Sequence, residues 1–158
     1  MEKELNLVTT FYEAFSRGDA EAMIACYHDD IVFHDPAFGE LHGEQAKNMW
    51  RMLIERSAGQ LKVSFSDVKA DEKTGSAHWV AKYKFAQTGR DVVNSIDATF
   101  EFRDGKILKH TDVFSMWKWS RQALGFKGWL LGWSPVVKNA VRKQAKSLLQ
   151  KYSVSQYR

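Results

Sequence analysis

Two carboxylates and one histidine are the strongest candidates in this sequence for acid–base chemistry. Asp35 ends an apolar run just before Pro36, and His110 and Asp112 lie two residues apart in a later alternating segment. Residues two apart in a strand share one face, so His110, Asp112 and Phe114 would lie together. A carboxylate that loses its hydration among aromatic side chains has a raised pKa. Such a group can exchange protons near neutral pH, and a neighbouring imidazole can orient a carbonyl or relay the proton.

Each of these residues also has a purely structural interpretation. Asp35 lies at the end of a strand, where a carboxylate often accepts backbone hydrogen bonds in a turn. His110 and Asp112 could point outward, or satisfy each other without contacting a ligand. His34 has the opposite parity from Asp35, so we expect it to face solvent or an interface. The sequence leaves these alternatives open.

The sequence lacks the patterns of several other kinds of site. Cys26 is the single cysteine, which excludes an intrachain disulfide and a cysteine-based zinc site. His34–Asp35 and His110–Asp112 do not have the spacing of recognised zinc ligands. No glycine-rich phosphate loop, Gly-x-Ser-x-Gly elbow or Cys–His nucleophile pattern occurs. We therefore predict neither a metal nor a cofactor.

Hydrophobic periodicity predicts the elements that must position the candidate residues. Helical spacing of apolar residues comes first along the chain, and period-two alternation follows Gly59. Val68 falls out of phase, which indicates a bulge near Asp67. Helices followed by long meander strands are typical of an α+β fold with the helices on one sheet face. We predict helices over 3–17, 20–28 and 43–57, and strands over 31–35, from 61, and over 77–87, 92–102 and 106–115.

The composition changes near residue 116. The 158 residues suit one domain with one sizeable core, and the formal net charge is +4. Residues 116–158 contain nine Lys or Arg and no Asp or Glu, so residues 1–115 carry a net charge of −5. Four of the six tryptophans also fall in this last stretch. We predict a domain over 1–115 and a basic, Trp-rich helical extension over 116–158.

The extension contains one clear helix, which Ser134 and Pro135 begin as N-cap and first helical residue. It packs on its own domain or on a dimer partner, or it binds an anionic membrane surface, as basic amphipathic helices with interfacial Trp do. Nucleic acid is disfavoured because the body is acidic and has no nucleic-acid motif. We expect an ordered extension with its tryptophans against the body and a basic face outward. The apolar stripe of the helix is Val137, Val141, Ala145, Leu148 and Tyr152.

Four stretches resemble the nuclear transport factor 2-like superfamily, and more narrowly its SnoaL-like and ketosteroid-isomerase-like branches. They are residues 14–19 (AFSRGD), 27–36 (YHDDIVFHDP), 100–107 (FEFRDGKI) and 110–112 (HTD). The resemblance covers about residues 3–115. It implies a cone-shaped, curved antiparallel sheet of long meander strands, wrapped by three N-terminal helices round an apolar pocket. It also implies a homodimer.

The resemblance places Asp35 at the position of the isomerases' general base. Both of the isomerases' oxyanion donors are missing, because Phe11 stands at the position of their Tyr and Ala98 at the position of their protonated Asp. Tyr12 is next to Phe11 but points about 100° away on a helix. Steroid isomerisation is therefore disfavoured. The polyketide cyclases of the SnoaL branch resemble the chain better, and Asp112 is the nearest candidate for their acid–base Asp.

We therefore predict a cofactor-independent lyase, isomerase or cyclase that acts on a small, largely apolar carbonyl compound. Its catalytic residues would be Asp35, His110 and Asp112. The rival is a non-catalytic ligand-binding or assembly module of the same fold. No signal peptide or membrane span is visible, so we expect a cytoplasmic protein. The predicted pocket lining is Phe11, Phe33, Trp50, Trp79, Tyr83, Phe85, Ala98, Phe100 and Phe114.

Overall fold

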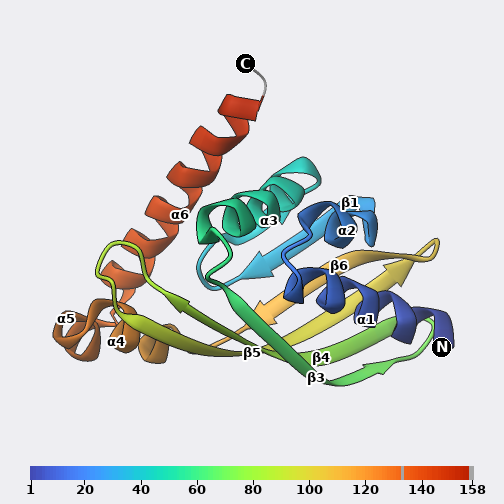
Figure 1. The fold of residues 1–158 in the computed structure, drawn as a ribbon, viewed down its shortest axis with the longest axis horizontal. Coiled ribbons are helices and arrows are strands. Elements are labelled where there is room, and N and C mark those ends of the chain that lie inside the picture. Colours follow the sequence, from blue (N-terminus) through green and yellow to red (C-terminus); the bar gives the residue numbers. More distant parts are fainter. Residues whose placement is uncertain (133, 157–158) are drawn as a thin grey trace.

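A computed structural model describes residues 1–132 and 134–156. Within that part of the chain, helices and one six-stranded sheet form an α+β fold (Figure 1). The elements are α1 (Glu2–Ser16), α2 (Ala20–Ala25), β1 (Tyr27–Asp35), β2 (Gly39–His42), α3 (Glu44–Ser57), β3 (Lys62–Ala70), β4 (Thr74–Lys84), β5 (Asp91–Arg103), β6 (Lys106–Val113), α4 (Met116–Leu124), α5 (Phe126–Leu131) and α6 (Pro135–Gln156).

The sheet has the strand order β2-β1-β6-β5-β4-β3 and is mixed. Strands β3 to β6 form the predicted antiparallel meander, but β1 pairs with β6 in parallel. The expectation of a wholly antiparallel sheet is therefore wrong at this one pair. Everything from β2 to β5 lies between the two strands in the sequence, which provides the long connection that a parallel pair requires.

Helices α1 to α3 cover one face of the sheet, which we call the inner face (Figure 1). Residues on α1 such as Val8, Phe11 and Phe15 are buried against it. Strand β5 alternates strictly between buried and exposed positions, as a strand does when only one of its faces is covered. The core thus lies between the inner face and the first three helices.

Two local predictions shift by a few residues. The second helix ends at Ala25 rather than at 28, and Tyr27 already begins β1. The turn expected at Thr74–Gly75 lies earlier, because the Asp71 carboxylate accepts hydrogen bonds from the backbone N–H groups of Lys73 and Thr74, both at 2.7 Å. Strand β4 therefore starts at Thr74.

The predicted bulge near Asp67 is confirmed. Asp67 has a φ of 56°, in the left-handed region, and the β3–β4 register shifts between Ser66 and Lys69. A left-handed residue inserted into one strand bends that strand and increases its local twist. The bulge also explains why Val68 falls out of phase with Val63 and Phe65.

The C-terminal extension forms α4, α5 and α6, and its tryptophans do not all pack inward. Trp119 is buried and Trp117 half-buried, whereas Trp129 is 52% exposed. The prediction that these side chains lie against the body is therefore right for Trp119 and wrong for Trp129. Trp133 lies outside the described residues.

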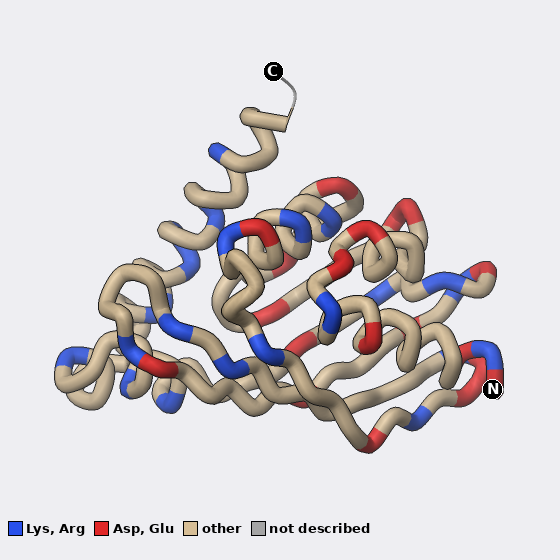
Figure 2. Tube along the Cα trace, viewed as in Figure 1, with Lys and Arg blue, Asp and Glu red and all other residues tan. Residues whose placement is uncertain are grey.

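Helix α6 packs on its own domain in this structure. Leu149 is part of the main core, and the stripe residues Ala145 and Leu148 pack against that core. The Arg142 guanidinium donates a 3.1 Å hydrogen bond to the carbonyl of Pro36, just beyond β1. Lys and Arg side chains line the helix without acidic neighbours on it (Figure 2). None of the described helices is long and apolar enough to cross a membrane.

Candidate functional site

The parallel pairing of β1 and β6 brings the candidate carboxylates together. The register pairs Phe33 with His110 and His34 with Thr111. Asp35 and Asp112 are the next residues along these two strands, and both face inward, being 9% and 2% exposed. His34 is exposed on the other face, as its parity predicts. The two carboxylates are therefore neighbours on the inner face.

A chain of buried hydrogen bonds holds His110 and Asp112 in place. The Trp50 indole N–H donates to the Tyr27 hydroxyl at 2.8 Å, and that hydroxyl lies 2.7 Å from His110 Nδ1. His110 Nε2 lies 2.8 Å from Asp112 Oδ1, which also accepts from the Trp79 indole N–H at 3.3 Å. All of these contacts lie in the interior, where buried polar groups need partners.

The direction of these hydrogen bonds indicates the protonation pattern of the site. Because the Tyr27 oxygen accepts from Trp50, its own O–H is available to donate to His110 Nδ1. The imidazole then carries its proton on Nε2 and donates to Asp112. With the proton on Nε2, every donor in the chain has an acceptor. The Tyr27 hydroxyl thus fixes both the orientation and the tautomer of the imidazole.

Asp35 has the environment of a proton-exchanging carboxyl group. Burial raises its pKa from 3.8 to about 7, and the nearby charge of Asp112 acts in the same direction. Backbone N–H groups of Phe38 and Ala37 and the positive charge of Arg142 oppose the rise. The N–H of Phe38 donates to Asp35 Oδ1 at 2.6 Å, so the turn-forming role that the sequence suggested is also present.

Two tyrosines that sequence reasoning did not assign to the site belong to it. Tyr12 is fully buried, and its hydroxyl has no hydrogen-bond partner among the described residues. Burial and then the charge of Asp112 raise its pKa well above the usual value. Although Tyr12 and Phe11 are adjacent, both are buried, because α1 is covered over a wide arc. Tyr27 has the same odd parity as Phe33 and Asp35, and this parity is the sequence signal that could have placed it on the inner face.

The predicted pocket-lining residues divide into two groups. Six are buried in the main core, and several of their rings contact the His110 imidazole, such as Phe100 with a centroid distance of 4.6 Å. Tyr83, Phe85 and Phe114 are half-buried near a second cluster formed with α4. The Tyr83 hydroxyl accepts a 2.7 Å hydrogen bond from the indole of Trp119. The buried group is Phe11, Phe33, Trp50, Trp79, Ala98 and Phe100.

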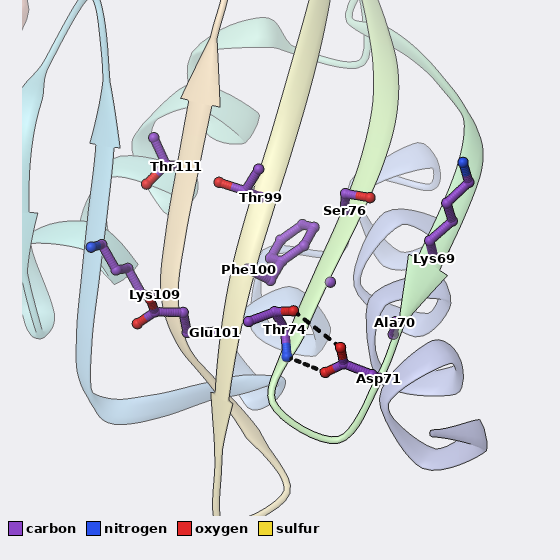
Figure 3. A pocket seen from close by; sticks show the side chains of 11 residues that line it. Lys69, Ala70, Asp71, Thr74, Ser76, Thr99, Phe100, Glu101, Lys109 and Thr111 are labelled. Atoms are coloured by element: carbon purple, nitrogen blue, oxygen red, sulfur yellow. Dashed lines mark hydrogen bonds between the residues drawn. The ribbon is translucent and has the colours of Figure 1, made fainter.

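Two surface hollows lie elsewhere, and of the predicted pocket-lining residues only Phe100 reaches one of them. One, of about 530 Å³, is on the outer face of the sheet, where Thr99, Thr111 and Ser76 stand with the helices behind the strands (Figure 3). The other, of about 510 Å³, lies between α2, α3 and α6. Neither is lined by Asp35 or Asp112. Within residues 1–132 and 134–156 no group of three or more His, Cys, Asp or Glu side chains is arranged to hold a metal.

A comparison with protein-family models assigns the chain to a family. The model of the SnoaL-like domain matches residues 8–110, which is more than half of the chain and includes the later part of α1, all of β1 and most of β6. The chain belongs to the SnoaL-like family. No curated protein matches its sequence.

Solved structures similar to this SnoaL-like chain share its fold at low identity. A candidate polyketide cyclase from Xanthomonas campestris pv. campestris has 23% identity and a TM-score of 0.63, covering 77% of this chain and 96% of its own. An epoxide hydrolase from M. tuberculosis, described as LEH-like, has 21% identity and a TM-score of 0.60, covering 86% and 96%. An NTF2-like protein of unknown function from Burkholderia pseudomallei has 17% identity and a TM-score of 0.60, covering 72% and 92%.

The SnoaL-like domain therefore presents a defined set of groups on its inner face. It has a carboxyl group whose pKa is about 7, a second carboxylate beside it and an oriented imidazole, and α1 adds a phenol without a hydrogen-bond partner among the described residues. These are the groups that general acid–base catalysis uses, and none of them needs a bound cofactor to exchange a proton.

Proposed function

We propose that this SnoaL-like protein is a cofactor-independent lyase, isomerase or cyclase that performs acid–base chemistry on a small, largely apolar carbonyl compound. The observation that carries the proposal is the juxtaposition of Asp35 and Asp112 on neighbouring strands of the inner face. Two adjacent buried carboxyl groups do not ionise equally, so one can hold a proton at a pH where the other is charged.

Asp35 is the proton-exchanging group in this proposal. Its pKa of about 7 means that it is protonated about half of the time at neutral pH, which suits both donation and abstraction. Asp112 Oδ1 accepts the hydrogen bond from His110 Nε2 and so orients the imidazole. The Tyr12 hydroxyl, which has no hydrogen-bond partner within residues 1–132 and 134–156, would donate to the substrate oxygen. The sequence had favoured Asp112 as the exchanging group, whereas the raised pKa of the buried Asp35 favours Asp35.

The aromatic surroundings suggest where a substrate enters. Tyr83 and Phe114 are half-buried, and each packs against both the main core and the cluster around Trp119. Burial raises the pKa of Tyr83, and the charge of Asp35 acts in the same direction, so the two side chains lie near each other. We assign the entrance to this boundary, with a largely apolar compound displacing the contact between the two clusters. Because the side chains at this boundary are largely aromatic, a substrate with few polar groups would fit there best.

The rival function is a non-catalytic ligand-binding or assembly module of the same fold. The complete internal hydrogen bonding of Tyr27, His110 and Asp112 favours it, because a satisfied chain needs no ligand. The fold neighbours include a candidate polyketide cyclase and an epoxide hydrolase, which supports an enzyme, but their identities lie below 25%. A homodimer and a cytoplasmic location stay predictions.

A ligand screen followed by product analysis separates the two functions. A panel of small cyclic and aromatic carbonyl compounds would be screened by thermal shift, and each stabilising compound incubated with the protein and followed by NMR. An enzyme converts at least one of them, and Asp35→Asn abolishes conversion while His34→Asn does not. Compounds that bind tightly and are never converted would favour the non-catalytic module.

A further inference from the structure

The helix α5 exposes apolar side chains at one end of the molecule. Phe126 is 73% exposed, Trp129 52% and Leu131 51%, and the first two rings stack with centroids 6.3 Å apart. Leu130 is 44% exposed. We call Phe126, Trp129, Leu130 and Leu131 the α5 patch. Soluble proteins rarely leave such a cluster uncovered without an interaction that uses it.

Close packing against α4 fixes the orientation of the patch. A Cβ atom on Gly128 would overlap the carbonyl of Ser120, so only a glycine allows this approach of α5 to α4. The Trp117 indole N–H donates a 3.1 Å hydrogen bond to the carbonyl of Trp129, which ties the two helices together again. With Gly128 against α4, the large side chains of α5 are left to face solvent. The exposure of the large α5 side chains therefore follows from the way α5 packs on α4.

The helices that carry and flank the patch contain basic residues and no acidic ones. Lys118, Arg121, Lys127 and Lys138 are exposed on α4, α5 and the start of α6. No Asp or Glu follows Asp112 in the sequence. In Figure 2 blue segments follow the trace of α4 to α6, and the red segment beside α4 belongs to the start of β5. The patch thus combines an apolar centre with a positive surrounding.

We infer that the α5 patch docks on an anionic lipid surface. Aromatic and aliphatic side chains of an interfacial helix enter the boundary between headgroups and acyl chains, and nearby Lys and Arg add about 1 kcal/mol each against anionic lipid. Figure 1 places α5 at one extremity of the long axis, where a flat surface can reach it. The sequence had suggested a membrane contact through the apolar stripe of α6, but Val141, Ala145, Leu148 and Tyr152 of that stripe pack against the rest of the protein.

The positive charge of the extension favours an anionic membrane, rather than a second copy of this chain, as the partner of the α5 patch. A twofold contact through the α5 patch would bring two basic extensions face to face, each with nine positive and no negative charges. An anionic bilayer offers the opposite charge together with an apolar layer. The inference concerns a surface distant from Asp35 and does not depend on the proposed function.

Vesicle co-sedimentation of the full chain tests the inference. The probes are vesicles of phosphatidylcholine alone and of equimolar phosphatidylcholine and phosphatidylserine, each at low and at high salt. We expect binding to the anionic vesicles at low salt. Phe126→Ser/Trp129→Ser should weaken it at least about tenfold, since two large apolar groups leave the lipid. Lys118→Gln/Lys127→Gln should weaken it several-fold at low salt and little at high salt.

The matched control variants replace exposed residues at other positions in the chain. Val113→Ser/Val154→Ser removes apolar side chains that are 60% and 51% exposed, and Lys3→Gln/Lys62→Gln removes two exposed charges. Neither should change vesicle binding. No binding by the intact protein at low salt, or equal losses in the controls, would overturn the inference. So would a dimer in sedimentation equilibrium that Phe126→Ser/Trp129→Ser dissociates, because a second copy would then be the occupant.

Discussion

His110 and Asp112 are joined by a 2.8 Å hydrogen bond from imidazole Nε2 to carboxylate Oδ1, and both side chains are buried. We predict that His110→Ala lowers the free energy of unfolding by roughly 2–5 kcal/mol, because the Tyr27 hydroxyl and the Asp112 carboxylate both lose a buried partner. Urea denaturation measures the change. The matched control is His34→Ala, whose side chain is exposed. Equal effects of the two substitutions would contradict the described chain of hydrogen bonds.

Asp35 should make stability depend on pH. Its pKa is about 7 in the folded state against 3.8 in its ordinary state, so the native protein binds more protons between these values. Stability then falls as pH rises from about 4 to about 7. Asp35→Asn keeps the acceptor for the Phe38 N–H and removes the buried charge. At pH 8 it should unfold at a higher temperature than the wild type, and its free energy of unfolding should be higher by at most about 4 kcal/mol.

The same comparison at low pH provides the control. Near pH 4 the wild-type carboxyl group is protonated, so the stability of Asp35→Asn should approach that of the wild type. Asp97→Asn changes an exposed carboxylate and should show a much smaller pH-dependent difference. Destabilisation by Asp35→Asn that is the same at both pH values would mean that Asp35 has a structural role alone.

Tyr12 and Tyr27 allow a comparison of how much a buried hydroxyl contributes to stability with and without hydrogen-bond partners. The Tyr27 hydroxyl bonds to Trp50 and to His110, whereas the Tyr12 hydroxyl has no partner among the described residues. Tyr27→Phe should therefore cost about 1–3 kcal/mol, and Tyr12→Phe should leave stability unchanged or raise it slightly. Thermal unfolding of both variants measures this. A larger loss for Tyr12→Phe than for Tyr27→Phe would refute the assignment.

Gly128 should be intolerant of any side chain. Its ideal Cβ position lies inside the contact distance of the Ser120 carbonyl, so Gly128→Ala must move α5 away from α4. We expect a loss of roughly 1–3 kcal/mol, as in other overpacked sites. Lys127→Ala is the neighbouring control and should be close to neutral, because Lys127 is exposed. If calorimetric scans show the same unfolding temperature for both variants, the close approach of α5 to α4 at Gly128 does not exist.

Local patterns in the sequence predicted much of the fold. The apolar spacing of α1 and α3 and the alternation of β5 each reflect one buried face, which a short window of residues records. The parity of His110 and Asp112 likewise placed them on one face. Strand β2 escaped prediction because it is four residues long and its residues Glu40 and His42 are exposed polar ones.

The pairing of distant segments could not be read from local patterns. Nothing near Asp35 records that β1 lies parallel to β6, and this pairing brings Asp35 beside Asp112. Tyr27 is 83 residues from the His110 that it orients, so its role depends on the whole fold. Trp129 was expected to be buried because of its type, whereas its exposure follows from the packing of Gly128 on α4.

Proton exchange on a bound compound tests the central claim most directly. A carbonyl compound that stabilises the protein would be incubated with it in deuterated buffer near pH 7, and deuterium at the carbon next to the carbonyl followed by NMR. The account predicts incorporation by the wild type, at least about a hundredfold slower with Asp35→Asn, and unchanged with His34→Asn. Incorporation that Asp35→Asn leaves unaltered, or bound compounds that never gain deuterium, would contradict it.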